Sequence, residues 1–88
     1  MVRDNAALSR FELDTDGAIA FANYERNGEI VSIIHTETPA ALRGRGIGSR
    51  LIEGVMTLLR QQRLKVRPLC GFARRVIAQH PEYRDLVV

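Results

Sequence analysis

The stretch Arg43-Gly44-Arg45-Gly46-Ile47-Gly48 decides the fold, because the hydrophobic pattern of the chain changes across it. Before it, the segment Ile30–Ile34 is apolar on both faces, which is typical of a central strand covered on both sides. After it, apolar residues recur at the spacing of one helix face, at Ile47, Leu51, Val55 and Leu58. The chain therefore passes from a strand through a glycine-rich loop into a helix.

The composition of this loop is that of an anion-binding site. Three glycines allow backbone N–H groups to approach a ligand closely. The start of the helix adds N–H groups that have no intrahelical partner, together with the positive end of the helix dipole. Arginines add charge from the loop and from the first helical turn. The sequence predicts that an anion binds to Arg43, Gly44, Arg45, Gly46, Ile47, Gly48 and Arg50.

Turn signals divide the rest of the chain into short elements, with no linker and no internal repeat. Strands are predicted over Leu8–Leu13, Ala18–Glu25, Glu29–Thr36 and Lys65–Leu69. Helices are predicted over Ile47–Gln62 and from Cys70-Gly71 to near His80, where Pro81 ends the second helix. This order, β-β-β-α-β-α, indicates a single α/β (α+β) domain over residues 1–88, in which an antiparallel meander leads into one βαβ unit.

Composition and charge narrow the function classes. The chain has 88 residues, of which 45 % are hydrophobic and 26 % charged, which excludes a disordered chain. Its net charge of +3 favours an anionic partner. No apolar run has the length of a membrane span, and the His and Cys spacing matches no metal site. The single cysteine, Cys70, excludes an internal disulfide, and we expect a cytoplasmic protein.

The spacing of the glycines separates this loop from other phosphate loops. The loop lacks the Gly-Lys-Ser/Thr sequence of nucleotide hydrolases and the G-x-G-x-x-G spacing of dinucleotide-binding proteins. It matches Arg/Gln-x-x-Gly-x-Gly/Ala, here Arg43-x-x-Gly46-x-Gly48, and so resembles the coenzyme A pyrophosphate motif of the GNAT N-acetyltransferase superfamily. The segments His35–Pro39, Val66–Cys70 and His80–Leu86 resemble a subgroup of very short, single-domain GNAT-like proteins.

The resemblance implies a minimal GNAT-like fold that binds acetyl-coenzyme A. The chain is too short for the two N-terminal helices and the last two strands of ordinary GNAT enzymes, so we expect an acceptor side that is open or completed by a partner. The resemblance also implies that the strand ending near His35, Thr36 and Glu37 runs beside the pantetheine arm. Arg74 and Arg75 follow Cys70 by about one helical turn and are predicted to contact the adenosine 3′-phosphate or an acidic acceptor, with solvated surface charge as the alternative.

Cys70 and His35 are the candidate catalytic residues. Cys70 is predicted at a helix N-terminus, which favours the thiolate, and the resemblance places this strand end at the thioester. Its thiol is interpreted as a nucleophile that takes the acetyl group or as an acid that protonates the departing coenzyme A; a buried, unreactive cysteine is the third reading. His35 is the candidate base, with Glu37 as the second candidate.

Three functions follow as hypotheses. The first is acetyl transfer from acetyl-coenzyme A to an amine on a protein or small molecule. The second is a coenzyme A-binding module without turnover, and the third is a nucleic-acid-binding domain that uses the basic residues. The third is disfavoured because the strands carry no aromatic pair for stacking on RNA and no helix-turn-helix pattern appears. We expect a monomer or a weak homodimer, with no metal and no membrane partner.

Overall fold

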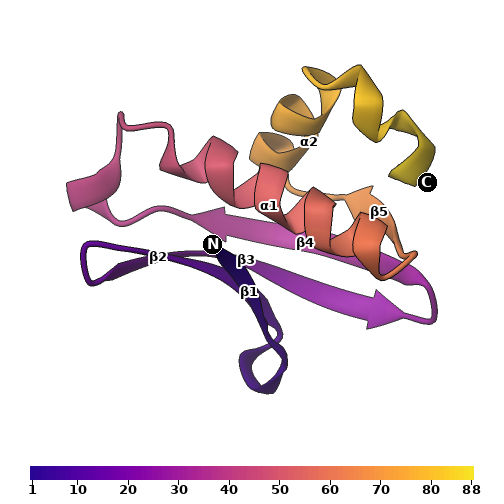
Figure 1. The fold of residues 1–88 in the computed structure, drawn as a ribbon, viewed down its shortest axis with the longest axis horizontal. Helices are drawn as coiled ribbons and strands as arrows, with labels where there is room; N and C mark the ends of the chain where they lie inside the picture. The colour runs from indigo at the N-terminus through magenta and orange to yellow at the C-terminus, as the bar shows by residue number, and fades with distance from the viewer.

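Five strands form one sheet, and two helices lie across it (Figure 1). The computed structural model describes residues 1–88. The strands pair in chain order, and every neighbouring pair is antiparallel except the parallel pair β4 and β5. The elements are β1 (Val2–Asn5), β2 (Arg10–Thr15), β3 (Ala18–Asn27), β4 (Ile30–Glu37), α1 (Ile47–Gln61), β5 (Lys65–Pro68) and α2 (Gly71–Ala78), with 3-10 helices η1 (Ala6–Leu8), η2 (Ala40–Leu42) and η3 (Pro81–Leu86).

This architecture confirms the predicted α+β fold, in which an antiparallel meander leads into one βαβ unit. The hairpin between β3 and β4 turns at Gly28-Glu29, between the paired residues Asn27 and Ile30, with Gly28 at a φ of +62°. The first helix ends one residue earlier than predicted, at Gln61. None of the helices is both long enough and apolar enough to cross a membrane.

Strand β1 was not predicted, because its sequence carries no apolar alternation. Val2 is its only apolar residue, and it packs against α1 at Gly54, where an added Cβ would lie 2.2 Å from Val2 Cγ2. The polar residues of β1 contact the neighbouring strands: the Tyr24 hydroxyl donates to Asp4 Oδ1 over 2.7 Å, and Arg3 forms an ion pair with Glu12. An edge strand stabilised by such contacts gives no periodic signal in sequence.

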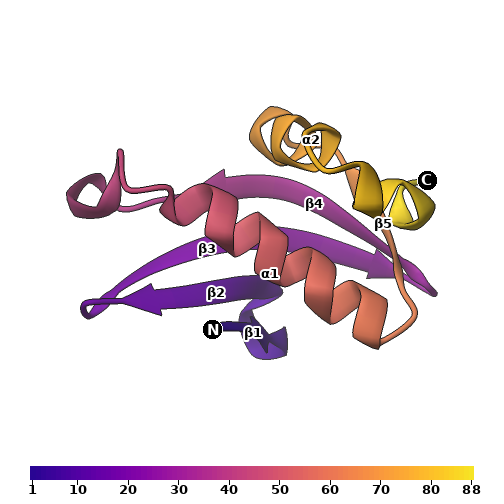
Figure 2. The same ribbon diagram turned by 45° about the horizontal axis from the view of Figure 1, so that its top comes forward.

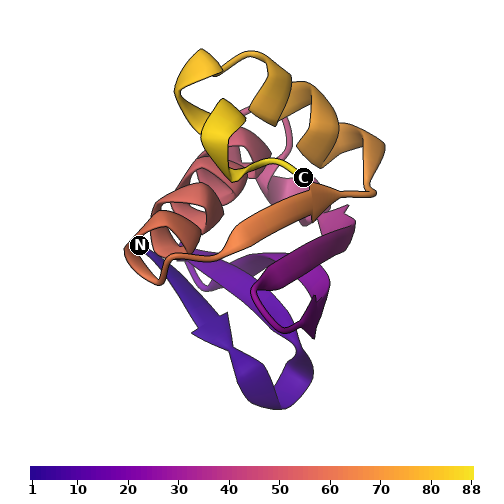
Figure 3. The ribbon, with the colours of Figure 1, turned by 90° about the vertical axis from the view of Figure 1, so that its right-hand side faces the viewer.

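Both helices cover the same face of the sheet (Figure 2). The view along the strands shows α1 and α2 side by side above the sheet, with the other face open (Figure 3). On β4, Val31 and Ile33 point into the core and are 1 % exposed, whereas Ile34 is 43 % exposed. The expectation that this strand is covered on both sides is therefore wrong, because no helix lies beneath the sheet.

A β-bulge in β4 changes which side chains face the helices. Asn23 pairs with His35 and Tyr24 pairs with Ile33, so Ile34 is an extra residue without a partner on β3. Strand β5 pairs with β4 only as far as Ile33. Residues 34–37 of β4 consequently have a neighbouring strand on one side alone, and β4 and β5 part at this point.

Glu12 is a buried carboxylate on the open face of the sheet. Its side chain is 3 % exposed and lies 2.6 Å from Arg10 Nε and 2.8 Å from Arg3 Nη2, and Asn5 donates a further hydrogen bond. Hydrogen bonds from Arg10 and Asn5 outweigh desolvation and hold the pKa of Glu12 below its ordinary value. The guanidinium of Arg10 also stacks 4.4 Å above the Phe21 ring. Glu12 and Arg10 together therefore connect β1, β2 and β3.

We expect Glu12 to make folding stability depend on pH. Because its pKa is lowered in the folded state, its stabilising contribution is complete above the unfolded pKa of about 4.3 and is lost as the pH falls through the folded pKa. Urea unfolding at pH 7 and at pH 3 measures this loss. Glu12→Gln removes the titration while keeping the shape, so its stability should change less between the two pH values. An equal change in both proteins would contradict this role.

Candidate functional site

The loop before α1 presents unpaired backbone N–H groups. Gly44 and Gly46 have φ values of +78° and +71°, in the left-handed region that glycine adopts without strain. Gly46 is the N-cap of α1 and has no side chain to accept a hydrogen bond. The N–H groups of Ile47, Gly48 and Ser49 donate to no group of the protein. Together with the helix dipole, these three donors have the chemistry that could hold an anion.

These donors open into a cavity of about 240 Å³ between the loop and α2. Five of the seven predicted anion-binding residues line it, which brings together most of the loop identified in the sequence. Phe72 closes the opposite wall, and an added Cβ at Gly48 would lie 2.8 Å from its ring. The lining residues are Thr38, Leu42, Arg43, Gly44, Gly46, Ile47, Gly48, Ser49 and Phe72.

The three arginines that were predicted to bind the anion differ in where their side chains lie relative to the cavity. Arg43 lines the cavity and its Nε donates to the Thr38 carbonyl oxygen over 3.3 Å, which holds the side chain across the loop. Arg45 points away from the cavity and forms an ion pair with Asp16 in the β2–β3 turn, at 3.3 Å. Arg50 is exposed on the first turn of α1 and does not line the cavity. Arg43 is therefore the arginine placed to contact an anion here.

Cys70 lies at the point where β4 and β5 part, as the N-cap residue of α2. Its thiol is half-buried and donates to Thr36 Oγ1 at 3.5 Å. Burial raises the pKa of Cys70, but hydrogen bonds from the Ala73 backbone, from Thr36 and from the Phe72 backbone outweigh it, so the net shift is downward. Phe72, whose backbone binds the thiol, also lines the loop cavity, so this residue contacts both the thiol and the cavity.

His35 and Cys70 lie on opposite faces of β4. Thr36 meets Cys70 on the helix side, so the preceding residue, His35, points to the open face. There its Nε2 lies 3.8 Å from Glu37 Oε1, and both side chains are about half exposed. The two candidate bases thus stand together, but the structure does not bring either of them to the thiol.

Arg74 lies apart from the loop cavity. It follows Phe72 by two residues, which turns it about 200° around the axis of α2. One guanidinium nitrogen donates to the Leu69 carbonyl oxygen at 3.3 Å, and the side chain lines a second cavity between α2 and η3. The structure therefore does not place Arg74 beside the other predicted coenzyme-binding residues.

Sequence reasoning missed the contribution of α2 to the site. Phe72 belongs to the apolar stripe of that helix, and nothing in the local pattern distinguishes it from the core residues Val76 and Ile77. Ser49 carried a signal that was overlooked, because it is the third residue of α1 and its N–H is one of the donors that a helix start leaves unpaired.

Comparisons with known proteins agree with this architecture. Residues 10–86 match the family model described as GCN5-related N-acetyl-transferase. The protein NATD1 from chicken is 34 % identical over 59 residues, which cover 66 % of this chain and 54 % of that protein. Human NATD1 is also 34 % identical over 59 residues and 52 % of its length is covered, so the chain spans about half the length of these relatives.

A solved protein structure has a similar fold. A GCN5-like protein from Staphylococcus aureus, determined in solution by NMR, superposes with a TM-score of 0.74 at 24 % sequence identity. The match covers 100 % of this chain and 87 % of that one, and at this identity it shows the fold alone. The family match over residues 10–86, the shared fold and the glycine-rich loop before α1 lead to one conclusion: this chain belongs to the GCN5-related N-acetyltransferase family.

Proposed function

We propose that this protein transfers an acetyl group from acetyl-coenzyme A to an amine. The observation that carries the proposal is the cavity at the start of α1, where three unpaired N–H groups and Arg43 face the same space. A pyrophosphate offers the acceptor oxygens and the negative charge that such donors require. The residues of the loop therefore fit the pyrophosphate of coenzyme A.

We assign the rest of the coenzyme to a path that runs from this cavity along β4. Phe72 and Thr38 form the wall toward α2 and β4, and beyond them the unpaired edge of β4 at residues 34–37 leads to Cys70. Exposed backbone groups along a strand edge bind an extended chain through hydrogen bonds. We assign the pantetheine arm to this edge, with His35, Thr36 and Glu37 contributing backbone groups, and the thioester to the vicinity of Cys70.

Cys70 acts as the acid in the proposed transfer. The amine nitrogen attacks the thioester carbonyl, the bond between the carbonyl carbon and the coenzyme sulfur breaks, and the Cys70 thiol gives its proton to the departing thiolate. The amine loses its own proton to solvent. This assignment agrees with the separation of Cys70 from His35 and Glu37, because a thiol that donates a proton requires no neighbouring base.

The alternative for Cys70 is covalent catalysis. Here the Cys70 thiolate attacks the thioester, coenzyme A leaves, and the acetyl group passes from Cys70 sulfur to the amine. The lowered pKa of Cys70 favours this route, since it increases the fraction of thiolate. The two routes differ in one observable, an acetyl group on Cys70 before any acceptor is added.

Incubation with acetyl-coenzyme A and a lysine-containing peptide tests the proposed function. We expect acetylated peptide and free coenzyme A in equal amounts, measured by mass spectrometry and by thiol titration. Coenzyme A release without acetyl-peptide would indicate hydrolysis. Tight binding of acetyl-coenzyme A with no turnover on peptides or small amines would contradict the enzymatic proposal and support a coenzyme A-binding module.

A further inference from the structure

A second cavity, of about 360 Å³, lies between α2, η3 and the end of β5. It shares no lining residue with the loop cavity, and it lies on the opposite side of α2 from Phe72. Arg74 reaches it from α2 and Arg84 reaches it from η3. The acetyl transfer proposed above uses neither this cavity nor Arg84.

The two guanidinium groups at this cavity have no carboxylate partner. Neither Arg74 nor Arg84 forms an ion pair within the protein, and Arg74 uses one nitrogen on the Leu69 carbonyl oxygen. By contrast, the nearby Arg60 has a carboxylate partner, because it donates to both carboxylate oxygens of Asp85 at 2.9 and 3.0 Å. Two arginines that line one cavity and have no carboxylate partner within the protein favour an anionic ligand there.

The acidic side chains of Glu82 and Glu53, close to this cavity, both contact His80. Glu82 accepts from His80 Nδ1 at 3.1 Å, and Glu53 lies 3.7 Å from His80 Nε2. His80 lines the cavity, so these contacts hold its ring at the rim and direct both glutamates to it. Neither glutamate forms an ion pair with Arg74 or Arg84.

Apart from His80, the remaining walls are apolar, which defines the ligand further. Ile77 is 6 % exposed and forms the floor, and Pro68 and Val87 form the sides. A polyphosphate or a nucleic-acid backbone would gain nothing from these surfaces. A carboxylate attached to an apolar group satisfies both the arginines and the floor.

The rim of the cavity favours a peptide over a small acid. Ala78, Pro81 and Arg84 are exposed, so the cavity opens directly to solvent and a main chain has room to continue past it. We propose that this cavity binds an acidic peptide segment, with a carboxylate between Arg74 and Arg84 and a flanking apolar side chain on Ile77.

A titration followed by NMR tests the proposal through the amide and methyl signals of Ile77 and Val87. The probe is a capped pentapeptide with one glutamate between two leucines, and its matched control has glutamine in place of glutamate. We expect saturable shifts at both residues and about tenfold weaker binding of the glutamine peptide, from the lost charge-assisted hydrogen bonds. Equal binding of the two peptides, or no saturable shift, overturns the proposal.

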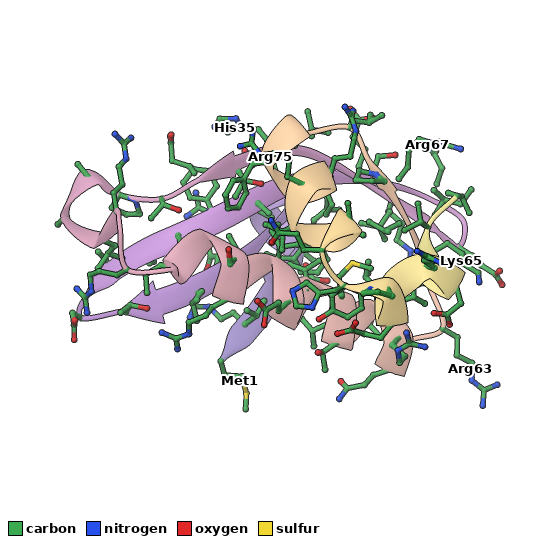
Figure 4. The ribbon with its side chains drawn as sticks, turned by 90° about the horizontal axis from the view of Figure 1, so that it is seen from above. Met1, His35, Arg63, Lys65, Arg67 and Arg75 are labelled. Atoms are coloured by element: carbon green, nitrogen blue, oxygen red, sulfur yellow. The ribbon has the colours of Figure 1, made fainter.

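Variants of α2 and η3 assign the binding to the two arginines. The double variant Arg74→Gln with Arg84→Gln should bind the glutamate peptide about tenfold more weakly. Arg75→Gln removes one positive charge from the next position of α2, which lies on the side of the helix nearer His35 (Figure 4), and should leave the affinity within about twofold. Equal losses in Arg75→Gln and the double variant overturn the assignment, because the effect is then one of net charge.

Two competitors separate this site from other anion sites. Saturating coenzyme A should leave the peptide affinity unchanged, because the two cavities lie on opposite sides of α2. Displacement of the peptide by coenzyme A would instead assign Arg74 and Arg84 to the coenzyme and overturn the proposal. Binding of free 4-methylpentanoate as tight as that of the peptide would overturn the peptide assignment in favour of a small organic acid.

Discussion

Replacing Cys70 by alanine should lower the rate of acetyl transfer by roughly 10²- to 10⁴-fold, the usual contribution of a positioned acid. The thiol lies where β4 and β5 part, 3.5 Å from Thr36 Oγ1. Neither of the other two catalytic candidates, His35 and Glu37, reaches this point. Because Cys70 does not line the loop cavity, the affinity for coenzyme A should change little. Steady-state kinetics on a lysine peptide, with calorimetry of coenzyme A binding, measures both quantities.

The matched variant Cys70→Ser separates chemistry from packing. Serine keeps a donor toward Thr36 and a similar volume, but its hydroxyl is a much weaker acid and nucleophile than the thiol. We expect Cys70→Ser to be as slow as Cys70→Ala. Mass spectrometry of the unsubstituted protein after mixing with acetyl-coenzyme A then distinguishes the acid from the nucleophile, since only the nucleophile carries an acetyl group. Full activity in Cys70→Ala would exclude both roles.

Titration of the thiol provides an independent check on its environment. The backbone N–H groups at the start of α2 and the Thr36 hydroxyl lower the pKa of Cys70 despite its partial burial. The rate of alkylation by iodoacetamide should therefore reach half its maximum at a lower pH than the rate for a solvent-exposed cysteine in a short peptide. Thr36→Val removes one of the lowering contacts, so its midpoint should move upward.

Replacing Gly48 by valine should weaken coenzyme A binding by at least about tenfold, because the new side chain occupies the cavity that the ligand requires. An added Cβ at this position already lies 2.8 Å from the Phe72 ring and 3.3 Å from Thr38 Oγ1. The side chain of valine would fill the space in front of the N–H groups of Ile47, Gly48 and Ser49. Isothermal calorimetry with coenzyme A measures the loss.

Gly54→Val is the matched control for overpacking on the same helix. There the new side chain would meet Val2 of β1 at 2.2 Å, far from the loop. Overpacking of this kind costs typically about 1–3 kcal/mol of stability in either variant. Coenzyme A affinity should fall only in Gly48→Val. If that variant does not fold, Gly48→Ala makes the same comparison with a smaller side chain. Equal affinities of Gly48→Ala, Gly54→Val and the unsubstituted protein would contradict the assigned cavity.

The loop could be predicted from sequence because its signal is local. Glycines before a helical period, with arginines beside them, determine backbone geometry and charge within a few residues of one another. The same holds for α1, whose apolar residues recur at helical spacing. Strand β1 gave no such signal, because Arg3, Asp4 and Asn5 acquire their role only from Glu12 and Tyr24 on other strands.

The arrangement of the catalytic candidates could not be predicted, because it depends on one unpaired residue. In a regular strand His35 would share the face of Ile33, which points toward the helices. The extra residue Ile34 reverses this order, so Thr36 meets Cys70 while His35 faces away. Whether Arg74 joins the loop likewise depends on the rotation of α2, which is set by Ala73, Val76 and Ile77 in the core.

The N-terminus of α1 is proposed to bind the pyrophosphate of coenzyme A, and a titration of the ¹⁵N-labelled protein with coenzyme A, followed through its amide signals, tests this binding. We expect saturable shifts that are largest at Ile47, Gly48 and Ser49, whose N–H groups are unpaired in the free protein. Saturable shifts confined to the cavity of Arg74 and Arg84, or no shift at millimolar coenzyme A, would contradict it.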